Sequence, residues 1–140
     1  FQCPWMDGDT HGVILRLMRL AGVVHVRERM SWRESSPERG VYTYGRYLSN
    51  ARRLHEQGFR ISCMVDDAPQ FAKRLEKLPS DLVVLYDFCR NTGKTFGGLV
   101  DAFEFWNEPD IGFAPEPVWD YVSALKAAHL GFKAGGILRN

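Results

Sequence analysis

The chain has 140 residues, of which 45% are hydrophobic and 25% are charged, and its formal net charge is +1. This length can bury the core of one modest domain. The near-neutral charge gives no electrostatic reason to expect nucleic acid as a partner, and no apolar run approaches the roughly 20 residues that cross a bilayer. We therefore expect neither nucleic acid nor a membrane among the partners.

The first predicted elements are a helix and a strand. Apolar residues at helical spacing predict a helix from about Thr10 to Ala21, and its apolar stripe consists of Val13, Ile14, Leu17, Met18 and Leu20. Gly22 can end this helix as a C-cap. A strand from Val23 to Arg29 is predicted next, followed by a long loop from Met30 to Tyr44 that carries turn signals.

The same module then recurs. A helix from about Gly45 to Gln57 presents one apolar face, formed by Tyr47, Leu48, Ala51 and Leu54. Gly58 precedes a strand from Phe59 to Val65, and a loop from Asp66 to Phe71 follows it. We expect these elements to repeat the packing of the first pair.

A third unit completes the pattern. A helix that begins near Ser80 or Asp81 presents Leu82, Leu85, Tyr86 and Cys89 to the sheet. The strand from Leu99 to Asn107 comes next, and a last helix runs from about Pro117 to Leu130. The apolar residues of that helix are Val118, Tyr121, Val122, Leu125 and Ala128.

The alternation of helices and strands predicts an α/β fold with a parallel sheet. A doubly wound open sheet would show the same alternation, but no glycine-rich turn of the dinucleotide or P-loop kind follows any predicted strand. The pattern therefore favours a (β/α)8 barrel. Because a complete barrel needs roughly 250 residues, we expect residues 1–140 to form part of one, from the first helix to the start of the fifth strand, truncated at both ends.

The three cysteines and four histidines do not form a metal-binding pattern. Cys3, Cys63 and Cys89 cannot all pair with one another, and their spacing matches no zinc site. Cys63 lies in a predicted strand and Cys89 in a predicted helix, so both are expected to be buried thiols. The histidines lack the spacing of a metal site and are expected to be structural. We expect no metal at these residues and no cofactor.

Polar residues follow each predicted strand and converge if the strands are neighbours: Arg27, Glu28 and Arg29; Asp66 and Asp67; Asn107 and Glu108. A single cluster of this kind is usually a solvated loop. The third cluster is sharper, because Pro109 cannot donate to a sheet ladder and ends pairing directly after Glu108. This leaves the Glu108 carboxyl at the carboxyl end of the strand, where barrel enzymes carry their chemistry.

The run Trp106-Asn107-Glu108-Pro109 resembles the fourth-strand signature of clan A glycoside hydrolases, which are retaining glycosidases. The segment from Val26 to Trp32 resembles their second-strand region, in which an Arg hydrogen-bonds the nucleophile and an aromatic residue follows. The segment from Asp66 to Ala72 looks like their third-strand end, except that Phe71 stands where Trp is more usual. The motifs occur in the order of that clan, and families such as 39, 42 and 5 are similar.

This resemblance implies hydrolysis of O-glycosidic bonds in oligo- or polysaccharides by double displacement. It implies that Glu108 is the general acid/base, that Asn107 hydrogen-bonds the sugar 2-hydroxyl and that Arg27 supports the nucleophile. The nucleophile would lie beyond Asn140, so residues 1–140 alone are expected to be inactive. Three further residues are expected to bind substrate, two of them as aromatic platforms: Asp67, Trp32 and Trp106.

Other interpretations stay open at this point. Arg27 can instead pair with Glu28 or Glu104 on the sheet, and the tryptophans can be core residues. The chain can be a half-barrel that binds carbohydrate or serves a structural role without hydrolysis, completed by self-association. A further alternative is a barrel enzyme in which Mg²⁺ is held by Asp66, Asp67 and Glu108, since hard cations prefer oxygen ligands.

Overall fold

The computed structural model describes residues 10–72 and 74–137 and contains three strands and several helices in alternating order. The strands are β1 (His25–Ser31), β2 (Arg60–Asp66) and β3 (Ala102–Phe105). The long helices are α1 (Thr10–Leu20), α3 (Gly45–Glu56), α4 (Leu82–Phe96) and α5 (Val118–Ala134). A short helix α2 (Trp32–Ser35) follows β1, and a 3-10 turn, η1 (Gln70–Ala72), follows β2.

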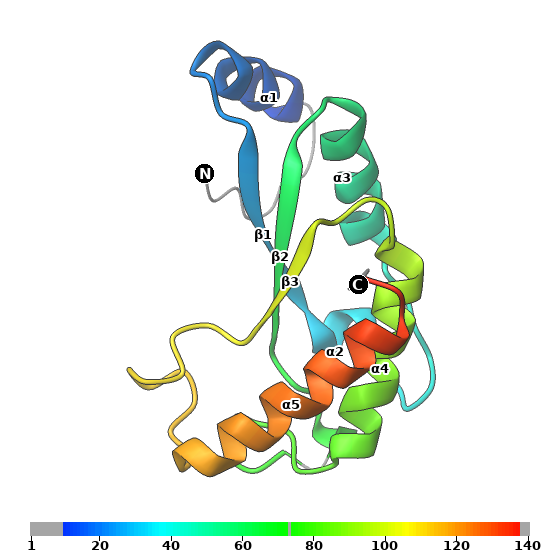
Figure 1. Ribbon diagram of the computed structural model, residues 1–140, viewed down its shortest axis with the longest axis vertical. Helices are drawn as coiled ribbons and strands as arrows, with labels where there is room; N and C mark the ends of the chain where they lie inside the picture. Colours follow the sequence, from blue (N-terminus) through cyan, green and yellow to red (C-terminus); the bar gives the residue numbers. More distant parts are fainter. Residues whose placement is uncertain (1–9, 73, 138–140) are drawn as a thin grey trace.

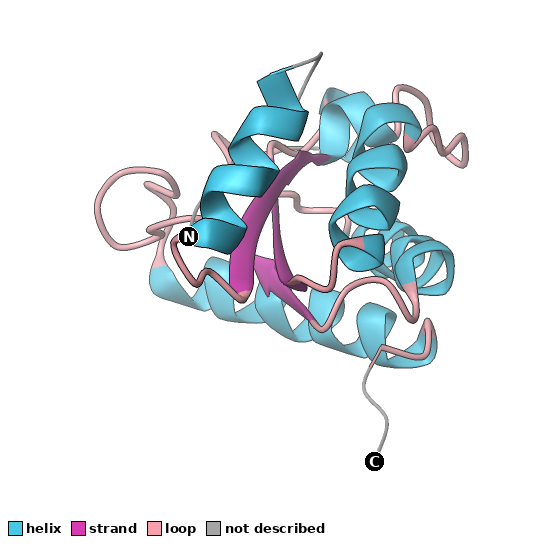
Figure 2. Ribbon diagram, turned by 90° about the horizontal axis from the view of Figure 1, so that it is seen from above, coloured by secondary structure: helices cyan, strands magenta, loops and turns pink. Residues whose placement is uncertain are grey.

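The three strands form one parallel sheet in the order β1-β2-β3 (Figure 1). Parallel strands that are neighbours in both sequence and space are joined by right-handed crossovers. When the strand order is sequential, these crossovers place their helices on the same face of the sheet. Helices α3, α4 and α5 accordingly gather on one side (Figures 1 and 2). This is the arrangement of consecutive βα units in a barrel, whereas a doubly wound sheet has helices on both faces.

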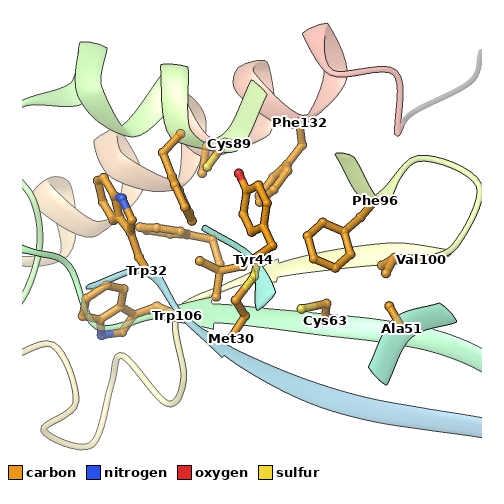
Figure 3. Packing of buried hydrophobic residues seen from close by; sticks show 14 of the residues in the cluster. Met30, Trp32, Tyr44, Ala51, Cys63, Cys89, Phe96, Val100, Trp106 and Phe132 are labelled. Carbon is orange, nitrogen blue, oxygen red and sulfur yellow. The ribbon is translucent and has the colours of Figure 1, made fainter. Parts of the chain in front are cut away.

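The pleat divides the strand residues between two faces of different character. Apolar residues face the helices and belong to the main core, among them Val26, Met30, Ile61, Val65 and Phe105. Figure 3 shows part of this core, in which residues of the strands and helices meet. The opposite face carries Arg27 and Arg29 on β1, Asp66 on β2 and Glu104 on β3. Alternating side chains thus give the sheet one apolar and one charged face.

Strands β1 and β3 differ from their predicted bounds for reasons of local hydrogen bonding. The Val23 amide donates to the Met18 carbonyl and so still belongs to the end of α1, while Ser31 pairs with Asp66 and extends β1. At the start of β3, the amides of Leu99 and Val100 both donate to the Phe96 carbonyl, so pairing begins only at Ala102. An amide that donates to a carbonyl at the end of a helix is not available to the strand ladder, so the strand begins later.

The predicted apolar face of α3 is confirmed, because Ala51 and Leu54 are buried. That of α4 is confirmed at Leu82, Leu85 and Cys89 but not at Tyr86, which does not belong to the core. Those of α1 and α5 were partly wrong. In α1, Leu15 and Met18 are buried, whereas the predicted stripe residues Val13, Leu17 and Leu20 are exposed. In α5, Val118, Val122 and Leu125 are exposed, and the buried face consists of Ala124, Ala128, Gly131 and Phe132.

Small residues let α5 pack closely against α4. A Cβ atom added at Gly131 would lie 2.5 Å from the Tyr86 carbonyl oxygen and 2.7 Å from the Cys89 Cβ. Real Cβ atoms do not approach backbone oxygens so closely. The absence of a side chain at Gly131 therefore allows the two helices to lie this near each other. Helical periodicity places Gly131 on a face but does not reveal how near the neighbouring helix comes.

One carboxyl group lies on the apolar side of the sheet. Glu28 points toward the helices and lines a cavity of about 20 Å³ together with Tyr47, Asn50 and Cys63. Its Oε1 atom is buried without a hydrogen-bond partner among the described residues, and burial raises the pKa of Glu28 to about 7. Glu28 therefore does not pair with Arg27, which lies on the opposite face.

We expect Gly131→Ala to lower the free energy of unfolding by about 1–3 kcal/mol, because the added methyl group overpacks the contact between α4 and α5. Gly12→Ala in α1 is the matched control, since its Cβ would be 3.9 Å from the Arg53 side chain. That substitution should stabilise the protein by up to about 1 kcal/mol. Urea unfolding of both variants measures the difference, and equal effects would contradict close packing at Gly131.

The raised pKa of Glu28 predicts a pH-dependent stability. The folded protein holds this proton up to about pH 7, whereas the unfolded chain releases it near the ordinary pKa of glutamate, so stability falls as pH rises through this window. Between pH 4 and pH 8, the loss from this group should be on the order of 3 kcal/mol. In Glu28→Gln this part of the slope should be absent, and in Glu56→Gln, an exposed control on α3, it should persist.

Candidate active site

The carboxyl ends of the three strands lie level with one another. Ser31 is paired with Asp66, and Val65 is paired with Phe105, so all three strands end at the same edge of the sheet. The segments that begin there contain most of the predicted site residues. The register of the parallel sheet therefore brings together residues that are far apart in sequence.

Arg27 lies on the charged face of the sheet and links β1 to β3. Its guanidinium donates to the two carboxylate oxygens of Glu104, with both distances 2.7 Å, and its Nη2 donates to Asn107 Oδ1 at 3.0 Å. The sequence left open whether Arg27 pairs on the sheet or serves the site, and the structure shows it pairing with Glu104 while contacting Asn107. A bidentate pair of this kind fixes the orientation of the guanidinium.

The contact with Arg27 also orients Asn107 toward Glu108. Since Asn107 Oδ1 accepts from Arg27, its amide nitrogen is left to donate, and Nδ2 lies 3.3 Å from Glu108 Oε2. Glu108 itself is exposed. A continuous polar chain thus runs from Glu104 through Arg27 and Asn107 to the Glu108 carboxylate.

A second ion pair, between Arg29 and Asp66, lies nearer the strand ends. Arg29 Nε donates to Asp66 Oδ1 at 3.1 Å and Nη2 donates to Oδ2 at 2.6 Å. Asp66 is 4% exposed, and this burial raises its pKa although the two hydrogen bonds from Arg29 lower it. Sequence reasoning did not assign this pair. The alternation of side chains along β1 and β2 was the available signal, since it places both residues on the charged face.

Asp67 ties the end of β2 to the segment that follows β1. Its carboxylate accepts from Ser31 Oγ at 2.8 Å and from the guanidinium of Arg33, and its carbonyl accepts from the Arg33 amide at 3.0 Å. These bonds give Asp67 a structural role. It also lines the cleft described below, so its predicted role in substrate binding stays a prediction.

Backbone strain is concentrated at these strand ends. In the described residues, positive φ angles outside glycine occur at Asp67 (63°), Trp106 (70°) and Glu108 (40°). Each such residue costs on the order of 1–2 kcal/mol relative to an ordinary conformation. Strain of this kind clusters at sites where the backbone must aim particular side chains. All three residues follow β2 or β3.

A cleft of about 390 Å³ opens between the loops that follow β2 and β3. It is lined by four charged residues, three apolar residues and a glycine: Arg29, Asp66, Asp67, Lys77, Trp106, Ile111, Phe113 and Gly112. A concave site with apolar walls and a few polar groups is typical of small-molecule binding.

The prediction that Trp32 is a substrate platform was wrong. Trp32 is 0% exposed and lies in the core (Figure 3). Its ring stacks on Phe88 of α4 with 4.8 Å between ring centroids. The helix α2 begins at Trp32, directly after β1, and turns the side chain back into the core between sheet and helices. A ring enclosed on all sides has no face to offer to a sugar.

Trp106 contributes to the cleft wall but is only 5% exposed. Its indole nitrogen donates to the Phe113 carbonyl at 2.7 Å, which holds the following loop against the end of β3. Its predicted role as a platform stays a prediction. Sequence reasoning missed Phe113, which is 47% exposed and lines the same cleft.

The alternative Mg²⁺ site finds no support in the described part of the chain. Asp66 is paired with Arg29 and Asp67 with Arg33, and within residues 10–72 and 74–137 no group of three His, Cys, Asp or Glu side chains converges as metal ligands would. In the same ranges, no helix combines the length and apolar character needed to cross a membrane.

The structure resembles those of solved glycoside hydrolases. A family 39 glycoside hydrolase from the gut symbiont Bacteroides cellulosilyticus matches with a TM-score of 0.76 and 21% identity, over 94% of this chain and 28% of that one. A beta-glucosidase from Exiguobacterium marinum matches with a TM-score of 0.63 and 20% identity, over 86% and 32% of the two chains. A GH5_18 from Bifidobacterium longum subsp. infantis has a TM-score of 0.55 and 16% identity, over 89% and 36%.

These likenesses concern the fold. No protein-family model matches the sequence, and no curated protein matches it. The chain spans about a third of the length of the solved structures described above. It therefore has the fold of part of a (β/α)8 barrel of the kind found in glycoside hydrolases, and both the predicted fold class and the predicted resemblance are confirmed at this level.

The Arg29–Asp66 pair predicts a cost when one partner is removed. Arg29→Met leaves a buried carboxylate without its cation, and we expect a loss of about 2–4 kcal/mol in the free energy of unfolding at pH 7. Replacing both residues, as Arg29→Met with Asp66→Leu, should recover much of that loss, because no buried charge is then left unpaired. Urea unfolding of Arg29→Met, Asp66→Leu and the double variant completes a double-mutant cycle. Additive changes in the free energy of unfolding would contradict coupling between the two residues.

Proposed function

We propose that this chain is part of the catalytic domain of a retaining glycoside hydrolase that cleaves O-glycosidic bonds, with Glu108 as general acid/base. The observation that carries this proposal is the polar chain from Glu104 through Arg27 and Asn107 to Glu108 at the carboxyl edge of a partial barrel. Barrel enzymes carry their catalytic groups at this edge.

The proposed chemistry needs a carboxyl group that works in two directions. In the first step, Glu108 donates its proton to the glycosidic oxygen while a second carboxylate attacks the anomeric carbon, which forms a glycosyl-enzyme and releases the leaving group. In the second step, Glu108 takes a proton from water, which attacks the anomeric carbon and frees the nucleophile. Exposure of Glu108 at the strand end leaves it accessible to both substrate and water.

Arg27 and Asn107 are proposed to prepare the site rather than to transfer protons. Arg27 holds Asn107 by its Oδ1 atom, so the Asn107 amide nitrogen is the group that remains to donate to a sugar hydroxyl. Such a bond to the 2-hydroxyl can strengthen as positive charge develops on the sugar ring. In the same proposal, Arg27 supports the nucleophile, a task that a fixed guanidinium suits.

The second carboxylate is proposed to lie in a part of the protein beyond Asn140. Two features support a larger barrel around this chain. Strand β3 lies at an edge of the sheet. A second hollow, separate from the cleft described above, lies between β3 and α5 and is lined mainly by apolar residues: Phe103, Phe105, Leu125, His129, Phe132 and Ile137. Apolar residues of α1 and α5 are also exposed, including Val13, Leu17, Val118 and Val122. Further βα units would cover both surfaces.

The test of this proposal uses the full-length protein and a panel of 4-nitrophenyl glycosides and unactivated disaccharides. We expect Glu108→Gln to lower kcat/KM for unactivated substrates by 10²–10⁴, because their leaving groups must be protonated. The first step should be slowed far less with 4-nitrophenyl glycosides, whose leaving group departs without protonation, so a burst of nitrophenol should remain.

The matched control is Asp110→Asn, which removes a neighbouring exposed carboxylate on the same loop and should retain most of the activity. Turnover of unactivated substrates at the wild-type rate by Glu108→Gln would contradict the assignment. Carbohydrate binding without any turnover by the wild-type protein would instead favour a binding or structural half-barrel.

A further inference from the structure

We propose that Phe113 determines specificity for the leaving group, its ring forming the apolar wall of the subsite that receives the group released in the first step. This inference rests on the proposed function and names a residue that the sequence patterns did not identify. It is carried by three observations: the exposure of Phe113 in the cleft, the two anchors that hold its loop, and the position of that loop relative to Glu108.

Phe113 and Ile111 present apolar surface to solvent within the cleft. Phe113 is 47% exposed and Ile111 is 67% exposed, yet both line a concavity of about 390 Å³ rather than a convex surface. Gly112 lies between them with a φ of 103°, a conformation that side chains rarely adopt. An exposed aromatic ring in a cleft is suited to stacking against an aryl group or the apolar face of a pyranose.

The first anchor fixes the loop at Phe113 itself. The Phe113 carbonyl accepts from the indole nitrogen of Trp106 at 2.7 Å, and Trp106 is buried with a φ of 70° at the end of β3. The main chain of Phe113 is therefore held against a rigid part of the sheet. A wall positioned in this way loses little conformational freedom when a ligand binds.

The second anchor joins the loop after β3 to the loop after β2. Glu116 Oε1 accepts from the backbone amides of Glu76, Lys77 and Leu78 at 3.0, 2.5 and 2.7 Å. Burial favours the neutral form, but these backbone hydrogen bonds dominate and lower the pKa of Glu116. The carboxylate thus ties the loop that carries Lys77 to the loop that carries Phe113, and both residues line the cleft.

The place of the loop identifies which part of the substrate meets Phe113. A general acid donates its proton to the glycosidic oxygen, which leaves with the departing group. Glu108 lies in the same loop as Phe113, five residues before it, and between two lining residues of the cleft, Trp106 and Ile111. We therefore place the group attached to that oxygen against this loop. Lys77 and Asp67 line the same cleft and supply polar groups for its hydroxyls.

The test compares two substrates of the full-length enzyme that share the sugar preferred in the glycoside panel and differ in leaving group. These are the phenyl and the methyl glycoside. Phe113→Ala should lower kcat/KM for the phenyl glycoside about tenfold more than for the methyl glycoside, since only the former stacks on the ring. Phe113→Tyr keeps the ring and should retain the wild-type ratio, and Val83→Ala, an exposed apolar control on α4, should change neither value.

Glu116 is a positioning residue in this proposal, so its test includes a structural readout. Glu116→Ala should raise the hydrogen-exchange rates of the Glu76, Lys77 and Leu78 amides at least tenfold and raise KM for the phenyl glycoside more than it lowers kcat. Glu56→Ala, which removes an exposed carboxylate from α3, should do neither. Thermal unfolding of each variant shows whether it is folded.

The outcomes separate this inference from the proposed function. Turnover by the wild-type enzyme with an unchanged phenyl-to-methyl ratio in Phe113→Ala would overturn the inference alone. Faster exchange in Glu116→Ala with unchanged KM would overturn the positioning role of the second anchor. Absence of turnover of any glycoside by the wild-type protein would overturn the proposed function, and the inference with it.

Discussion

The register of the parallel sheet is the constraint on which the rest of the structure depends. Because Ser31 is level with Asp66 and Val65 is level with Phe105, three segments separated by long helices leave the sheet at one edge. A shift of one residue in either pairing would exchange the apolar and charged faces of a strand. A shift between β1 and β2 would break the Arg29–Asp66 pair, and a shift between β2 and β3 would break the Arg27–Glu104 pair.

Packing and chemistry are divided between the two faces of this sheet. The helix-facing side is almost wholly apolar, and the helices that cover it pack so closely that Gly131 of α5 has no room for a methyl group against α4. The other side carries paired charges, and buried Met64 lies on it apart from the main core. The partly buried Glu28 is an exception on the apolar side. Its cost is kept down by retaining the proton up to about pH 7.

The strand ends combine rigid anchors with strained backbone. Positive φ angles at Asp67, Trp106 and Glu108 are sustained because the surrounding side chains hold them in place, including the Ser31 and Arg33 bonds to Asp67 and the indole bond to Phe113. Such conformations persist only where neighbouring structure over-determines them. The orientation of the loops that form the cleft is therefore set by hydrogen bonds with the strand ends and neighbouring segments rather than by the loop sequences alone.

The sequence by itself determined the order of the strands and long helices and the glycines that follow helices, because periodicity and left-handed glycine caps are local properties. It also placed Glu108 beyond the end of a strand, but β3 ends at Phe105, earlier than the predicted Asn107, because the chain turns at the positive φ of Trp106 before it reaches Pro109. Tertiary structure alone decided which residues meet. Trp32 was assigned to the substrate and lies in the core, the apolar stripes of α1 and α5 were misjudged, and Phe113 and the Arg29–Asp66 pair were not identified. These features depend on register, on the distance between helices and on loop anchors that join residues far apart in the chain, and no local pattern encodes them.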